Sequence, residues 1–380
     1  MQRSREHILT THAGSLYRPP ELLEMITAGV QGAPLDAQRF ADELRHDVDE
    51  AVNRQVACGI DIVGDGELSK PNFSDFIVDR LSGFEGENPH EVFPNRRLDF
   101  PDYYGAQPGP SGTRRPLCVG PIAWKDKQAL HRDIENLRAA VTSAGVAEAF
   151  LPSPSPGIVA MRIPNAYYGS EGAYLDALAE ALSEEYRAIV DAGFILQIDA
   201  PDAPMAWTAQ FDAERFDDYS RTLSMRNAAL NDALEGIPEE SVRYHICWGN
   251  NEAPHTLDIP LERIIDQVFK VRAQAYSIEA ANPRHAHEWD LWRDVRLPDG
   301  KILIPGVIDS TTNFVEHPQL VAQRIMQYCS VVGRENVIAG TDCGFGTMAR
   351  LSPRVHPDVM WAKLATLAEG ARLASERLWP

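Results

Sequence analysis

The sequence predicts an α/β fold, a (β/α)8 TIM barrel formed by one domain over residues 1–380. Three observations predict this class. Short apolar runs alternate with longer stretches of helical period, the apolar runs lack the polar alternation of a half-exposed sheet, and several runs end on an acid, a histidine or a cysteine. Such strands indicate a parallel sheet covered on both faces, and functional groups of barrels gather where the strands end.

The N-terminal part supplies two strands and a helix. The run 8–15 is apolar and closes on Gly-Ser, and the run 59–67 is apolar and ends on acids. Between them, 36–58 is rich in Asp, Glu and Arg and has a helical period. The order strand, helix, strand is the first repeat expected of a barrel.

Residues 82–116 interrupt the alternation with many Pro, Gly and aromatic residues and no helical period. Such a stretch inside a compact domain is expected to be an irregular excursion or a lid over the site. The apolar run 116–122 returns from it as one more strand. With it the chain has nine strand candidates, and the eight outside the excursion would close the barrel.

From residue 126 onward the alternation is regular. Helices are expected at 126–143, 171–192, 215–235, 258–273, 317–332 and 356–377. The strands between them are 147–152, 194–201, 243–248, 275–280, 302–309 and 336–342. A doubly wound open sheet is the alternative, but no GxGxxG follows a first strand to indicate a dinucleotide crevice.

The composition narrows the class of protein. The chain is 44% hydrophobic, has a formal net charge of −19, and contains no apolar run long enough to span a bilayer. The acidic balance argues against nucleic acid or a membrane as partner. Five scattered cysteines and no signal peptide predict a reduced, cytoplasmic protein. The helix at 171–192 could pack on the barrel or on a second copy, so a homo-oligomer is one arrangement it allows.

Two stretches predict a metal site. His245 and Cys247 are two residues apart on a strand, so their side chains point to the same side. Cys343 ends another apolar run, and Glu279 ends the strand that lies between them in the sequence. Nitrogen and sulfur ligands favour zinc over magnesium or calcium. The alternative is that these cysteines are small buried apolar residues, because their spacing matches no zinc-finger pattern.

A second set of polar residues also follows strands. Ser15, Glu67, Asp199 and Asp309 would share one rim of a barrel with the metal ligands. The backbone of the Gly14-Ser15 turn could hold a carboxylate. Each acid also has a structural interpretation, as a helix cap, a partner of a nearby lysine or a turn former.

Such a centre suits one kind of chemistry. Two thiolates and a histidine make zinc a weak Lewis acid, which disfavours hydroxide generation and favours holding a substrate thiolate. A free thiol is only a few per cent ionised at pH 7, so full ionisation gains roughly 30-fold, or about 2 kcal/mol. The rest of the reduction in the activation barrier must come from alignment of the thiolate with an electrophilic carbon.

The motifs resemble a known family. His245-Ile246-Cys247, Glu279 and Asp342-Cys343-Gly344 are similar to the zinc signature of cobalamin-independent methionine synthases, in their C-terminal barrel, and of epoxyalkane:coenzyme M transferases. The likeness runs from Thr11-His12-Ala13-Gly14-Ser15 to Cys343 and so covers nearly the whole chain.

The resemblance implies a (β/α)8 barrel and residue roles that follow the motifs. Zn2+ would be held by His245, Cys247, Glu279 and Cys343, and an amino-acid thiol by Gly14, Ser15, Glu67 and Asp199, with catalytic roles for Asp199 and Asp309. The acids would take the ammonium group of the thiol, and the Gly14-Ser15 backbone its carboxylate.

The chain also departs from the family. No Trp occurs in 151–160, where the family packs one against folate, and no His occurs in 310–313 after the Gly-Val-x-Asp motif. Both departures argue against methyltetrahydrofolate as donor. The chain has no room for the additional N-terminal barrel of full-length family members, which makes it similar to short paralogues that alkylate other thiols. Coenzyme M carries a sulfonate and no ammonium, for which Arg18, Lys70 and Arg162 are candidates.

We therefore predict a zinc-dependent enzyme that transfers a methyl or larger alkyl group from a small donor to a small thiol of homocysteine or coenzyme M type. Two other classes remain open at this point. A zinc hydrolase on the same barrel is disfavoured by the two cysteines, and a structural zinc site in a binding protein would need four protein ligands.

Overall fold

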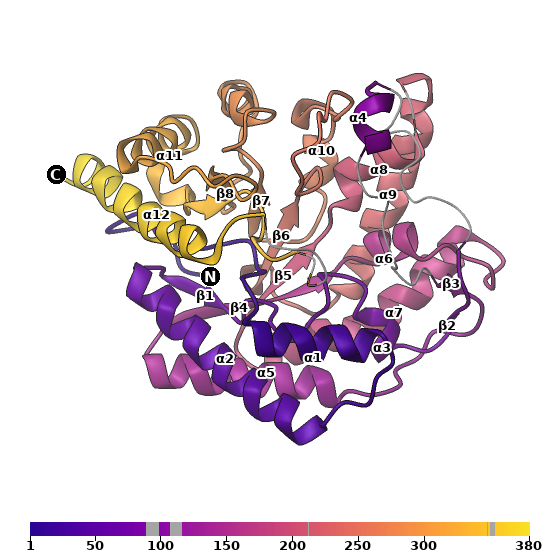
Figure 1. The fold of residues 1–380 in the computed structure, drawn as a ribbon. Coiled ribbons are helices and arrows are strands. Elements are labelled where there is room, and N and C mark those ends of the chain that lie inside the picture. Colours follow the sequence, from indigo (N-terminus) through magenta and orange to yellow (C-terminus); the bar gives the residue numbers. More distant parts are fainter. Residues whose placement is uncertain (89–98, 107–115, 212, 348, 350–353) are drawn as a thin grey trace.

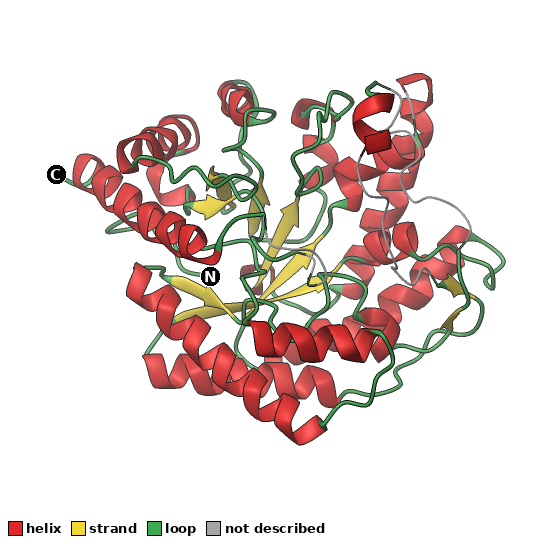
Figure 2. Ribbon diagram, in the orientation of Figure 1, coloured by secondary structure: helices red, strands yellow, loops and turns green. Residues whose placement is uncertain are grey.

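The computed structural model describes residues 1–88, 99–106, 116–211, 213–347, 349 and 354–380. Its centre is a curled sheet of seven parallel strands in the order β1-β4-β5-β6-β7-β8-β9. The strands are β1 (Ile62–Gly64), β4 (Glu148–Pro154), β5 (Ile195–Asp199), β6 (Val242–Ile246), β7 (Ala275–Ile278), β8 (Ile302–Ile308) and β9 (Gly340–Thr341). They run through the middle of the molecule, and helices surround them (Figures 1 and 2).

The two edges of this sheet approach the same N-terminal segment. Thr10 forms an isolated parallel bridge with Ala339, and Thr11 forms one with Ile62. Thr11 N donates to Ala339 O at 2.9 Å, and Ile62 N donates to Thr10 O at 3.0 Å. The strand expected at 8–15 is therefore reduced to isolated bridges, because side chains bind His12 and Ala13 in place of a regular ladder.

The strand expected at 116–122 lies outside the main sheet. It is β3 (Leu117–Cys118), which pairs in antiparallel fashion with β2 (Phe84–Glu85). The assignment of this run to the excursion is confirmed. The excursion also contains the short helix α4 (Pro101–Ala106). Residues 89–98 and 107–115 lie outside the described part of the chain, so the expected lid stays a prediction.

The helices cover the outer face of the sheet. They are α1 (Pro20–Val30), α2 (Ala37–Cys58), α3 (Ile77–Arg80), α5 (Gln128–Ala144), α6 (Pro156–Arg162), α7 (Glu171–Asp191), α8 (Asp202–Gln210), α9 (Phe216–Ala233), α10 (Ile265–Val268), α11 (Pro318–Val332) and α12 (Pro357–Leu378). Short 3-10 turns are η2 (Ala213–Arg215), η3 (Glu239–Ser241), η4 (Leu261–Arg263), η5 (Ala286–Arg293) and η6 (Arg334–Asn336). No described helix is long and apolar enough to cross a membrane.

One expected helix is wrong, and α1, α3, α4, α6 and α8 were not expected. The stretch 258–273 forms only η4 and the single turn α10, because two short turns that both bury apolar residues reproduce the spacing of a helix. Helix α1 begins at the second of two consecutive prolines, Pro20. Helices α6 and α8 are buried over most of their surface, so they lack the polar face that marks a helix in a sequence.

The apolar core has two layers. The larger one lies between the sheet and the surrounding helices. The smaller one is formed by Leu9, Ile62, Phe150, Ile195, Ala275, Ile302, Ile304 and Ile338. These side chains come from β1, β4, β5, β7 and β8, from the N-terminal segment and from the run before β9. The inner layer therefore receives side chains from nearly the whole curve of the sheet, as the interior of a barrel does.

Candidate functional site

A cavity of about 300 Å³ opens beyond the carboxyl ends of the strands. Six of the residues expected at the site line it: Ser15, Glu67, Asp199, His245, Cys247 and Cys343. Among the described residues, Gly14, Glu279 and Asp309 do not belong to its lining. The structure thus brings most of the expected residues into one space.

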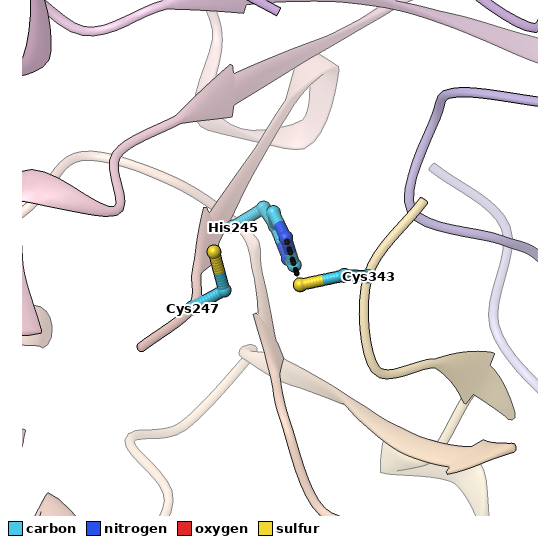
Figure 3. Close-up of side chains that lie close together, drawn as sticks. All are labelled: His245, Cys247 and Cys343. Carbon is cyan, nitrogen blue, oxygen red and sulfur yellow. Dashed lines mark hydrogen bonds between the residues drawn. The ribbon is translucent and has the colours of Figure 1, made fainter. Parts of the chain in front are cut away.

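Three of these residues form a compact group of potential metal ligands. His245 is the fourth residue of β6, Cys247 follows the strand, and Cys343 comes from the loop after β9 (Figure 3). Their ligand atoms all lie within 4.8 Å of one another. His245 Nε2 is 3.9 Å from Cys343 Sγ. In the part of the chain that the structure describes, no other group of three or more His, Cys, Asp or Glu residues meets this geometry.

The donor set fits zinc. One imidazole nitrogen and two sulfur atoms are ligands that zinc accepts and that magnesium and calcium do not favour. Nδ1 of His245 lies 3.1 Å from Ser277 Oγ, which leaves Nε2 on the side of the two cysteines. A hydrogen bond to the second ring nitrogen is the usual way in which proteins orient a metal-binding histidine.

Glu279 lies beside this group and is not part of it. Its Oε1 is 3.6 Å from Cys343 Sγ and accepts a hydrogen bond from Trp248 N at 2.9 Å. Its Oε2 accepts hydrogen bonds from Asn282 Nδ2 and Arg284 Nη2, each at 2.8 Å. Burial raises the pKa of the Glu279 carboxyl to about 8, although the Arg284 charge lowers it. Its role as a fourth ligand stays a prediction.

The pKa values of the two cysteine thiols are shifted in opposite directions. A hydrogen bond from Cys343 holds the pKa of Cys247 well below its usual range, with further help from His245. The same hydrogen bond, together with burial, raises the pKa of Cys343 well above its usual range. Cys247 therefore ionises more readily than Cys343, and a cation between them would favour ionisation of both.

Two buried carboxyl groups share the same cavity. Burial, with repulsion from Asp199, raises the pKa of Glu67 to about 8. Burial also raises the pKa of Asp199 to about 6, although the His245 charge lowers it. Among the described residues, Glu67 Oε2 has no hydrogen-bond partner. An acidic pair with an unsatisfied oxygen is well suited to a cationic group of a ligand.

The Gly14-Ser15 turn packs against these groups. Gly14 has a φ of 131°, and a Cβ atom there would lie 2.3 Å from Glu67 Oε1. A Cβ atom on Gly344 would lie 2.0 Å from Ser15 Oγ and 2.8 Å from Ser15 N. Phe345 N donates to Ser15 O at 2.7 Å. The turn is therefore held between Glu67 and the loop that carries Cys343.

Asp309 is placed differently from the other expected acids. Its Oδ1 accepts hydrogen bonds from Thr311 N at 3.0 Å and Thr311 Oγ1 at 2.8 Å. Its Oδ2 accepts hydrogen bonds from Thr312 N at 3.1 Å and Thr312 Oγ1 at 2.5 Å. Burial alone would raise the pKa of Asp309, but these four bonds lower it. Its placement supports a turn-forming role, and its catalytic role stays a prediction.

The basic residues considered for a sulfonate all have protein partners, although Nε of Arg18 has none among the described residues. Arg18 lines the cavity and donates to the carbonyl oxygens of Gly346 and Glu67. Arg162 lines it and pairs with Asp75 at 2.8 Å. Lys70 does not belong to the described lining and donates to a main-chain carbonyl at 2.7 Å.

Sequence reasoning missed several polar residues behind the site. The carboxylate of Glu279 is bound by Asn282 and Arg284, and its loop is bound by Asp342. Arg243 is buried and is linked to Asp199 through Gln197. Arg243 gave a usable signal, because an arginine inside an apolar strand needs several acceptors. The contacts of Asn282 and Arg284 depend on how a loop turns, which no spacing in the sequence reveals.

The curled parallel sheet, with a His-Cys-Cys group at its carboxyl end, defines a class of α/β proteins with a candidate thiolate metal site. No family model matches the chain. A methionine synthase from Saccharolobus solfataricus is 24% identical over 380 residues, which covers 97% of this chain and 95% of that protein. The uncharacterized protein YxjH from Bacillus subtilis is 24% identical over 367 residues, with 93% and 91% covered.

Solved structures agree with these relatives. A B12-independent methionine synthase from Shewanella sp. W3-18-1, in complex with selenomethionine, superposes with a TM-score of 0.76 at 23% identity and covers 98% of this chain and 99% of that one. A putative one from Listeria monocytogenes gives 0.67 at 18% identity, with 98% and 99% covered. The resemblance to the cobalamin-independent methionine synthase family that the motifs predict is confirmed.

Proposed function

We propose that this protein is an enzyme that transfers a methyl or larger alkyl group to the thiol of a homocysteine-type amino acid, with zinc as cofactor. One observation carries the proposal: His245, Cys247 and Cys343 converge within 4.8 Å on a cavity that also contains two buried carboxyl groups. One end of such a cavity suits a thiol, and the other suits an ammonium group. The relatives named methionine synthase, which align over nearly the whole chain, support the same chemistry.

Zinc would be held by His245, Cys247 and Cys343, with Glu279 as the fourth protein ligand. Bound there, it would ionise a substrate thiol while leaving the sulfur nucleophilic. The residues around it have separate tasks. Ser277 orients the imidazole of His245, and Arg284 holds the carboxylate of Glu279.

The acceptor would be oriented by its two charged groups. Its ammonium would lie against Glu67 and Asp199, and its carboxylate against the backbone of Gly14 and Ser15. Burial of both acids supports this assignment, because a cation between them removes their mutual repulsion. Asp199 would be the catalytic carboxylate. It lies opposite His245 in the register of β5 and β6.

A coenzyme M-type thiol is the second acceptor class. Arg18 and Arg162 do line the cavity, which favours an anion. Arg18 is bound to two main-chain oxygens and Arg162 is paired with Asp75, whereas the acids beside the cysteines would repel a sulfonate. We therefore favour the amino-acid thiol.

Two other classes fit less well. A structural zinc site keeps four protein ligands, whereas here the three converging ligands face a cavity, from which an incoming thiol could displace the proposed fourth ligand, Glu279. A hydrolytic zinc site prefers histidine and carboxylate ligands, and two cysteines weaken its Lewis acidity. We also propose that residues 1–380 form a single domain. In it, the segment around Thr10 and Thr11 would close an eight-stranded barrel.

The first experiment measures zinc content and methionine formation from homocysteine, with methyltetrahydrofolate and S-methylmethionine offered in turn as donors. Cys247→Ser and Cys343→Ser should each lose most of the zinc and nearly all of the activity. Cys58→Ser, which changes a half-buried cysteine on α2, is the matched control and should keep both. Full activity of metal-free protein, or of either site variant, would contradict the proposal.

The acceptor class is tested by zinc-edge X-ray absorption with homocysteine and with coenzyme M. The number of sulfur neighbours of zinc should rise from two to three with homocysteine and stay at two with coenzyme M. A rise only with coenzyme M would replace the amino-acid acceptor by the sulfonate one. A sulfur count that never changes would support a structural site.

A further inference from the structure

The side chains of Arg243 and Gln197 form a buried link between the two ends of the proposed acceptor site. Arg243 lies on β6 opposite Gln197 of β5, and the two are 1% and 0% exposed. Arg243 Nε donates to Gln197 Oε1 at 2.7 Å. Gln197 Nε2 donates to Asp199 Oδ1 at 2.7 Å and to Ala13 O at 2.8 Å.

The same arginine also binds the N-terminal segment directly. Its Nη1 donates to Thr11 Oγ1 at 2.9 Å, and its Nη2 donates to His12 O at 2.8 Å. Its guanidinium lies 3.4 Å from the ring centre of Phe150, which closes one face of the group. Arg243 therefore joins β5, β6 and the segment that leads into the Gly14-Ser15 turn.

The orientation of the Gln197 amide follows from these partners. An arginine can only donate hydrogen bonds, so the oxygen of the amide must face Arg243. The NH2 group must then face Asp199 and the carbonyl oxygen of Ala13. A flipped amide would place its NH2 group against the Arg243 donor and its oxygen against the acceptor oxygens of Asp199 and Ala13, which leaves buried groups unsatisfied.

We infer that Arg243 and Gln197 are positioning residues that fix the distance between Asp199 and the Gly14-Ser15 turn, and thereby select an acceptor with an amino-acid head group. The inference rests on the proposed function, which places the ammonium at Asp199 and the carboxylate at the turn. The bridges between this segment and the sheet end at Thr11. Main-chain bonds resume at Ser15 and Leu16, which bind Phe345 and Gly66, but neither bond reaches β5. Between them, His12 and Ala13 are held by the side chains of Gln197, Arg243 and Thr341, whose Oγ1 accepts from Ala13 N at 3.1 Å.

The test measures binding of L-methionine by calorimetry and the KM for homocysteine, using the zinc-loaded protein. Gln197→Glu keeps the size of the side chain but presents an acceptor to Asp199 and Ala13. We expect its Kd for methionine and its KM for homocysteine to rise by at least tenfold, with a smaller change in kcat and unchanged zinc content. Gln197→Met removes the bonds without adding repulsion and should have a smaller effect in the same direction.

Arg243→Lys keeps the positive charge but cannot direct three bonds at once. Its Kd for methionine should rise about tenfold, and the variant that combines it with Gln197→Met should bind no more weakly than the worse single variant, because the pair acts as a unit. Arg80→Lys is the control. Arg80 is also buried and pairs with Asp133 and Glu185, and none of these three residues lines the cavity, so this change should lower the melting temperature without changing the Kd.

The outcomes separate the inference from the function on which it rests. Wild-type Kd and KM values in Gln197→Glu and in Arg243→Lys, with zinc retained, would overturn the inference and leave the function standing. A rise in Kd for Arg80→Lys as large as for Gln197→Glu would also overturn it, because general destabilisation would then explain the loss. A wild-type protein that holds zinc but binds neither methionine nor homocysteine would remove the proposed function and the inference together.

Discussion

Glu67 shows how one residue can connect burial to ligand choice. Its carboxyl is buried, its pKa is raised to about 8 by that burial and by repulsion from Asp199, and its φ of 53° is rare for a residue with a side chain. Because the folded protein holds this proton more tightly than the unfolded chain, Glu67 lowers stability as pH rises between about 4.5 and 8. A residue in a cavity wall that lowers folding stability in this way is typically a functional one.

The first prediction concerns this proton. Near pH 7 the pair of Glu67 and Asp199 holds about one proton, and an ammonium group between them lowers both pKa values. Binding of L-methionine should therefore release close to one proton. Methionine has no thiol, so the release cannot come from ionisation of sulfur. Calorimetry in buffers of different ionisation enthalpy measures it.

Glu67→Gln is the control for that titration. It cannot lose a proton, so its binding heat should not depend on the buffer, although its affinity should be about tenfold weaker. A wild-type heat that is also independent of the buffer would place the ammonium elsewhere. The sequence located both acids at strand ends, but it could not show that they share one proton, because their separation depends on the curl of the sheet.

At the scale of elements, Asp342 joins the loop that carries Cys343 to the loop that carries Glu279. Its Oδ1 accepts from Ala280 N at 2.8 Å and Ala281 N at 2.7 Å, and its Oδ2 accepts from the main-chain and side-chain nitrogens of Asn282 at 2.8 and 2.9 Å. Asn282 in turn holds Glu279. The glycine at position 306 provides the space for this carboxylate, because a Cβ atom there would lie 2.1 Å from Asp342 Oδ1.

The second prediction is that Asp342→Asn weakens zinc binding. An amide nitrogen would face main-chain N–H groups, so the loop after β7 should shift away from Cys343. Loss of an outer partner of a metal site typically costs about 10- to 100-fold in affinity, and we expect that range here. Competition with a chromophoric chelator measures it.

Asp61→Asn is the matched control for this change. Asp61 also accepts from a backbone nitrogen, that of Thr10 at 2.8 Å, but it precedes β1 at the opposite end of the strands. The Asp61→Asn substitution should lower the stability of the protein and leave its zinc affinity unchanged. Equal zinc affinity in Asp342→Asn and wild type would show that the loop holds its position without the carboxylate.

The elements also show which parts of the fold the sequence predicts. Strands such as β5 and β8 follow from apolar runs, and α2 and α12 follow from clear helical periods. Helices α6 and α8 do not, because both are buried on nearly every side. Arg243 is conspicuous in the sequence as an arginine inside an apolar strand, but its partners are visible only when three segments far apart in the chain come together.

At the scale of the whole molecule, the question is how the curled sheet is held at its two edges. The N-terminal segment supplies Thr10 to the run before β9 and Thr11 to β1. Near it, Ser4 Oγ donates to Val337 O at 2.6 Å and accepts from Leu9 N at 3.0 Å. The sequence predicts a barrel from its alternation, but only bridges of one or two residues join the edges, and no pattern of apolar residues can show so short a contact.

The last prediction uses amide hydrogen exchange to test whether this contact closes the sheet. In a closed barrel the edge amides open only when the whole protein unfolds. The amides of Thr11, Ala339 and Ile62, which donate across the contact at 2.8 to 3.0 Å, should then exchange within about tenfold of those of β5 in the middle of the sheet. Tenfold corresponds to a difference of about 1.4 kcal/mol in opening free energy.

Ser4→Ala provides the perturbation. It leaves Val337 O and Leu9 N without this partner, at a cost of about 1–3 kcal/mol. In a closed barrel that cost lowers the protection of the edge amides and of β5 alike, because they open together. If the edge amides of the wild type exchange much faster than β5, and only they respond to Ser4→Ala, the molecule is an open half-barrel. The turn that is proposed to hold the acceptor carboxylate would then detach from Asp199 at a free-energy cost well below that of unfolding.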